Sequence, residues 1–104
     1  MRPEYIQELL KVYRDYVTEM RLDLDRQKYR LNKTTEDIRG CKLEMRGLIQ
    51  LKTDNRTVVD RIEYLQQKIQ ARSRENNGLQ IEYKKLKLKY NACKGKLYNM
   101  EKEA

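Results

Sequence analysis

Apolar residues recur along the whole chain at alternating spacings of three and four residues. This spacing places them on one face of an α-helix, whereas a strand would alternate at every second residue. The series is apolar at eleven of thirteen positions from Ile6 to Leu48 and at twelve of fifteen from Leu51 to Met100, although apolar residues make up only 38% of the chain. A stripe sustained over so many turns is a heptad seam, which predicts an all-α coiled coil.

In the heptad notation abcdefg, the seam occupies positions a and d. Its principal apolar members are Leu10, Val17, Leu24, Leu31, Ile38, Met45, Leu48, Leu51, Val58, Ile62, Leu65, Ile69, Leu79, Tyr83, Leu86, Tyr90 and Leu97. The phase changes once, so that a first heptad frame covers residues 1–48 and a second covers residues 48–104. Two successive steps of three at the join form a stammer, which overwinds a coiled coil locally. We therefore expect distortion around residues 45–51, where Gly47 also weakens the helix.

The best candidate for a chain reversal is Asn76-Asn77-Gly78. The seam keeps its phase through this segment, however, and a loop has no reason to do so. The sequence therefore predicts one continuous helix, with residues 1–104 forming a single coiled-coil segment. Because such a helix cannot bury its apolar stripe alone, it must pair with another helix, and the partner we expect is a second copy.

Two asparagines, Asn55 and Asn76, fall at position a. A buried Asn at a hydrogen-bonds to its twin in a parallel dimer and thereby sets the register. The pairs that a parallel dimer would form between g and the following e position are attractive at Asp23–Lys28, Asp37–Lys42, Glu82–Lys87 and Lys96–Glu101, and repulsive only at Lys89–Lys94. The pattern predicts a parallel two-stranded homodimer with the seam residues as its core.

Near the N-terminus the apolar surface is wider than a dimer seam needs. The additional residues are Tyr5 and Val12 at position c and Leu9 and Tyr16 at position g. Exposed apolar patches mark interaction sites, so these four residues are a candidate docking ridge for a protein partner, or a site of local association into a three- or four-helix bundle. Alternatively, they only cover the edge of the dimer core.

The net charge is +8, and residues 83–98 carry six lysines and no acid. These lysines are Lys84, Lys85, Lys87, Lys89, Lys94 and Lys96. Such a stretch attracts polyanions, which include the acidic tails of filaments, nucleic acid and anionic lipid. Alternatively, it is the solvated basic face that many coiled coils have.

Residues that would support catalysis are scarce. The chain has no His, no phosphate-binding glycine motif and no nucleophile–base pair, so we expect no enzyme activity, no metal and no cofactor. Cys41 and Cys93 both lie at d, where we expect small reduced core residues. The alternative is an interchain disulfide between each cysteine and its twin in an oxidised dimer. Arg72 also lies at d, and we expect its stem to lie along the seam while its guanidinium reaches Glu75 or solvent. No segment is long and apolar enough to span a membrane.

The heptad seam resembles the coiled-coil rods of cytoskeletal, centrosomal, motor-adaptor and tethering proteins in general. The pattern favours a homodimerising spacer or scaffold segment of an intracellular, cytoplasmic protein associated with the cytoskeleton. The seam still runs at Met100, so we expect a segment of a longer rod. The alternative function is a coiled-coil module that binds a polyanion through residues 83–98.

Overall fold

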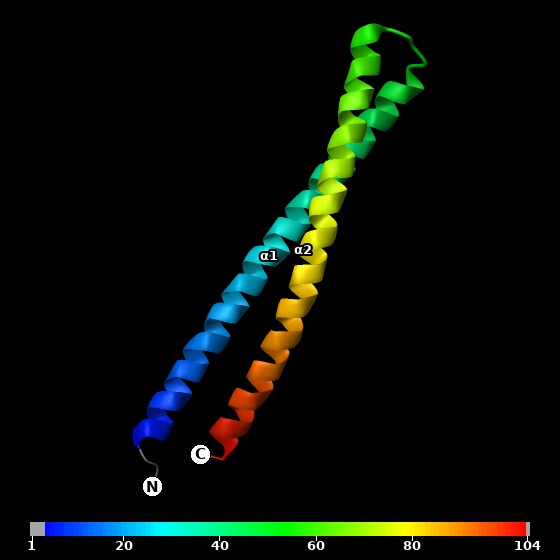
Figure 1. Cartoon of the computed structure of the whole chain (residues 1–104). Helices are drawn as coiled ribbons and strands as arrows, with labels where there is room; N and C mark the ends of the chain where they lie inside the picture. Colours follow the sequence, from blue (N-terminus) through cyan, green and yellow to red (C-terminus); the bar gives the residue numbers. More distant parts are fainter. Residues whose placement is uncertain (1–3, 104) are drawn as a thin grey trace. The chain divides into compact units, whose positions relative to one another are not determined.

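The computed structural model describes residues 4–103 and contains two long α-helices (Figure 1). Helix α1 spans Glu4–Gln50 and helix α2 spans Arg56–Lys102. Residues 51–55 connect them, and no strand occurs within the described range. The all-α class predicted from the seam is confirmed.

Contacts divide the chain into two units, each holding a stretch of both helices. Unit 2 is Tyr29–Gln80 and contains the connection between the helices. Within it, Arg61 pairs with Glu44, and further from the connection Asn76 contacts Thr34. Because residues later in α2 meet residues earlier in α1, the two helices of unit 2 run antiparallel.

Unit 1 combines Met1–Lys28 with Ile81–Ala104. Arg14 pairs with Glu101, and the Lys28 ammonium lies over the ring of Tyr83. This order again shows an antiparallel pair of helices inside the unit.

The seam residues form the interior of both units. Every seam position from Ile6 to Leu48 and from Val58 to Met100 is buried or half-buried, whereas Leu51 and Asn55 are exposed. The most deeply buried side chains are Leu10 in unit 1 and Leu65 in unit 2, each 1% exposed. Each helix therefore covers its apolar stripe with the stripe of the other helix of the same chain.

The prediction of one uninterrupted helix is wrong, because α1 ends at Gln50, beside the phase change of the seam. Backbone hydrogen bonds of the tighter i to i−3 kind close its last turn, from Leu51 N to Leu48 O at 3.2 Å and from Lys52 N to Ile49 O at 3.1 Å. Lys52 then adopts a φ of 49°. This left-handed conformation reverses the direction of the chain after a helix.

The start of α2 is set by Asn55. Its side-chain Oδ1 accepts a hydrogen bond of 3.0 Å from the backbone N–H of Thr57, and its carbonyl accepts one of 3.0 Å from Val59. These are the bonds of a helix N-cap. Asn55, predicted as a register residue in a dimer core, is thus an exposed cap in the connection. Asn76-Asn77-Gly78 lies inside α2, as its unbroken phase predicted.

Replacement of Lys52 by Gly is expected to stabilise the protein by about 0.5–1 kcal/mol. A residue with a Cβ pays roughly 1–2 kcal/mol in the left-handed region, and the extra flexibility of an unfolded Gly offsets only part of that gain. Urea unfolding followed by circular dichroism measures the change. The control is Lys42→Gly, inside α1 and exposed, which should lose up to about 1 kcal/mol. A loss at both positions would indicate a helix that continues through Lys52.

Candidate interaction surfaces

A layer of polar side chains crosses the interior of unit 2. The amide nitrogen of Asn76 donates to Thr34 Oγ1 at 2.7 Å and to Thr35 Oγ1 at 3.1 Å, and it lies 3.4 Å from the carbonyl of Leu31. Its amide oxygen accepts a hydrogen bond of 2.7 Å from Gln80. Asn76 and Thr34 are both buried. Because a slip of one helix past the other would leave the amide unpaired, this layer sets the register of α1 against α2.

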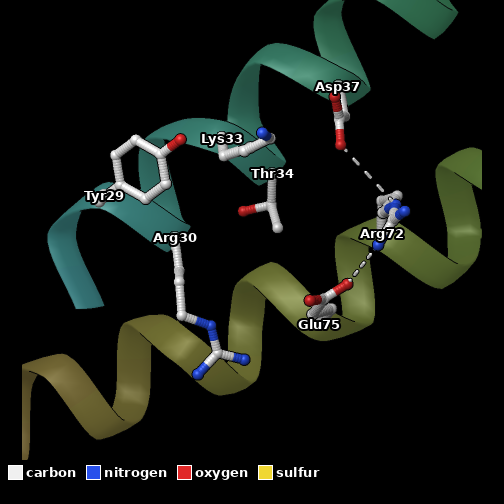
Figure 2. Close-up of a pocket in the computed structure, with 7 residues that line it drawn as sticks. All are labelled: Tyr29, Arg30, Lys33, Thr34, Asp37, Arg72 and Glu75. Carbon is white, nitrogen blue, oxygen red and sulfur yellow. Dashed lines mark hydrogen bonds and ion pairs between the residues drawn. The ribbon is translucent and has the colours of Figure 1, made fainter. Parts of the chain in front are cut away.

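The guanidinium of Arg72 lies between two carboxylates, as Figure 2 shows. Its Nη1 donates to Glu75 Oε2 at 2.9 Å, and its Nε lies 3.9 Å from Asp37 Oδ2. The predicted contact with Glu75 is confirmed. The hydrogen bond and charge of Glu75, with a smaller contribution from Asp37, raise the pKa of Arg72. This position is therefore cationic at every ordinary pH.

Arg72, Asp37 and Glu75 also line an open pocket of about 200 Å³ (Figure 2). Its remaining lining residues are Tyr29, Arg30, Lys33 and Thr34. Three cations and two anions line this pocket, and its charged groups are exposed or half-buried. It lacks the enclosed apolar walls with a few converging polar groups that bind small molecules.

A second inter-helix ion pair of unit 2 joins Arg61 to Glu44. Arg61 Nε and Nη2 donate to the two carboxylate oxygens at 2.6 and 3.0 Å. These hydrogen bonds lower the pKa of Glu44 and raise the pKa of Arg61. Both side chains are nearly half exposed, so solvent and salt weaken the pair and its effect on stability is small.

The seam of unit 1 is flanked on one side by the e positions of both helices and on the other side by their g positions. Arg14 and Glu101, both at e, form an ion pair with a 2.7 Å separation. The e positions of the two helices therefore share one side, the e side. The g positions share the other, the g side, where the Lys96 ammonium lies 5.7 Å from the ring centroid of Tyr13.

The predicted docking ridge lies along the g side of α1 in unit 1. Tyr5, Leu9, Val12 and Tyr16 are 69%, 50%, 64% and 41% exposed, and neither helix of the chain covers them. Tyr16 also meets Tyr13 edge to face, with ring centroids 6.4 Å apart. The ridge is therefore continuous with the buried seam and adds to it a strip of exposed apolar surface.

The six lysines of the basic stretch fall on different sides of α2, and all are exposed. Lys87 and Lys94 occupy e positions, with Lys84 beside them at b. Lys89 and Lys96 occupy g positions, with Lys85 beside them at c. On the e side, Lys87 and Lys28 both lie over the ring of Tyr83, at 5.9 and 5.7 Å from its centroid. Sequence reasoning missed Lys28, because only the pairing of the helices brings it to the basic stretch.

Both cysteines of the chain lie at seam positions of the helices. Cys41 is buried and Cys93 half-buried, and both are free thiols. Among residues 4–103, no group of three or more His, Cys, Asp or Glu side chains is placed to hold a metal ion. In the same range, no helix is long and apolar enough to cross a membrane.

No family model matches this chain, and no match is found among the curated proteins or the solved structures that were compared. Its surfaces therefore have to be interpreted from their own geometry and charge.

Proposed function

We propose that this chain is a structural interaction module that forms a parallel homodimer through its N-terminal ridge. The observation that supports the proposal is the exposure of four large apolar residues, Tyr5, Leu9, Val12 and Tyr16, on a helix whose seam is already covered. Pairing of the seam itself with a second chain would require the two helices of unit 1 to separate. The ridge is available while these two helices stay paired.

Charges beside the ridge favour a second copy in parallel orientation. Glu8 and Asp15 occupy f positions of α1 along one border, and Lys89 and Lys96 of α2 lie along the other. All four are exposed. A two-fold axis parallel to the helices places Asp15 of one copy opposite Lys96 of the other, because Lys96 lies at the level of Tyr13. An axis perpendicular to the helices would place acids opposite acids, which is repulsive.

Such a dimer suits a spacer or scaffold rather than a catalyst. It places two copies of unit 1 side by side with their α1 helices running in the same direction. The setting we propose is a cytoskeletal, centrosomal or motor-adaptor assembly, where helical modules of this kind hold other components at a fixed separation.

Sedimentation equilibrium of the Leu9→Asp/Tyr16→Asp variant tests the proposal. We expect the unmodified chain to dimerise and the variant to dissociate at least about tenfold more readily, because burial of one large apolar side chain contributes roughly 1.5–3 kcal/mol. Circular dichroism should show unchanged helix content. The control is Ile81→Asp/Leu88→Asp, which changes two exposed apolar residues at f positions of α2, away from the ridge and its borders, and should still dimerise. An unmodified chain that stays monomeric at several hundred micromolar would overturn the proposal.

A further inference from the structure

We propose that the e side of unit 1 binds the phosphate backbone of double-stranded nucleic acid, through a cationic face built from both helices. Its central cations are Arg21 and Lys28 of α1 with Lys87 and Lys94 of α2. This site lies on the side of the seam opposite the ridge, so it does not depend on the proposed dimerisation.

Two lysines from different helices converge at the centre of this face. The ammonium groups of Lys28 and Lys87 lie 5.7 and 5.9 Å from the centroid of the same ring, that of Tyr83. The ring attracts each cation through its negative face, but the two like charges repel one another. An anion bound beside either ammonium would reduce that repulsion, which makes this part of the e side a favourable position for a phosphate.

The face extends from this pair in both directions. Arg21 precedes Lys28 by seven residues and Lys94 follows Lys87 by seven, which is about 10 Å along each helix. The Lys94 ammonium lies 5.8 Å from the ring centroid of Tyr90. None of these four cations takes part in an ion pair between residues 4 and 103. Glu101, the one acid at an e position of unit 1, is already paired with Arg14.

The surroundings favour a duplex over a protein or a single strand. No large apolar residue is exposed at an e position of the described part of unit 1, whereas protein interfaces have an apolar centre. Single strands are held by successive bases that stack on several open aromatic rings. Lysines cover the rings of Tyr83 and Tyr90, which leaves only Tyr98, at a b position of α2, as an exposed ring beside this face. Lysine binds phosphate as a point charge, which suits contact with a regular backbone without base readout.

The experiment measures binding of a fluorescent 20-base-pair DNA duplex by anisotropy between 50 and 200 mM salt. We expect log K to fall with log salt at a slope of about −4, because four phosphate contacts release about 0.9 counterions each. The variant Lys28→Gln/Lys87→Gln/Lys94→Gln should reduce that slope by about 3 and weaken binding at 50 mM salt at least tenfold.

The matched control is Lys52→Gln/Lys85→Gln/Lys102→Gln, which removes the same net charge from exposed positions outside both the e side of unit 1 and the charged borders of the ridge. It should retain most of the affinity and the slope. All proteins are compared at a concentration where sedimentation shows the same oligomeric state. Equal losses in the two variants, or no duplex binding at 50 mM salt, would overturn the proposal. Tighter binding of polyglutamate than of the duplex would also overturn it and would indicate an acidic protein as the partner.

Discussion

Replacement of Leu65 by Ala is expected to lower the free energy of unfolding by about 2–5 kcal/mol, whereas the same replacement at Leu51 should change it by less than about 0.5 kcal/mol. Both leucines fall at d in the second heptad frame. Leu65 is 1% exposed and Leu51 is 62% exposed. Truncation of Leu65 removes apolar contacts and leaves a cavity between α1 and α2, while Leu51 in the connection has little packing to lose.

Urea unfolding of the two variants measures the difference, and the slope of the transition should stay unchanged if both remain two-state. This pair of substitutions also separates two architectures. In a continuous coiled coil, Leu51 would be a core residue like Leu65, and both variants would lose several kcal/mol. Comparable losses at the two positions would therefore contradict the helix break at residues 51–55.

Replacement of Asn76 by Ala should lower the free energy of unfolding by about 1–3 kcal/mol. The change removes the amide that bridges Thr34, Thr35 and Gln80 and leaves buried polar atoms with fewer partners. The control is Asn91→Ala, at an exposed position of the same helix. It should be neutral within about 0.5 kcal/mol or slightly stabilising, because Ala is the better helix former.

A double-mutant cycle with Thr34→Val tests the partner of Asn76 directly. The Thr34 hydroxyl accepts the 2.7 Å hydrogen bond from the amide, so we expect a coupling energy of about 1 kcal/mol. In a parallel dimer of continuous helices, Asn76 would face its own twin, far along the rod from Thr34. A coupling energy within about 0.3–0.5 kcal/mol of zero would then be found, and it would contradict the hairpin.

The turn illustrates how a correct pattern led to a wrong conclusion. The phase change at Leu48 marked the place where the helix ends, but an insertion of three residues and a chain reversal disturb a heptad pattern in the same way. The polar segment Thr53-Asp54-Asn55 was the signal that could have distinguished them, since such residues favour turns and helix caps. Its last residue fell at position a, where it fitted the pattern of a buried register asparagine equally well.

The charged residues likewise did not predict from the sequence which partners they have in the structure. Most of the pairs used to predict a parallel dimer have other partners in the hairpin: Asp37 meets Arg72, Glu101 meets Arg14, and Lys28 and Lys87 meet at Tyr83. Each side chain has several oppositely charged neighbours within reach once the helices are placed. The six lysines can likewise be divided between the e side and the g side only when it is known which helix pairs with α2.

The sequence by itself determined that this chain is helical and which face of each helix is buried, because heptad spacing and burial follow from the geometry of one helix. Only the tertiary structure decided what covers that face. A seam of Leu, Ile, Val and Tyr packs against any similar seam, so its pattern does not predict which helix covers it. Closing a five-residue connection costs little entropy, whereas recruiting a second chain costs translational and rotational freedom. The nearer seam, on the same chain, is therefore the one with which each helix of this protein pairs.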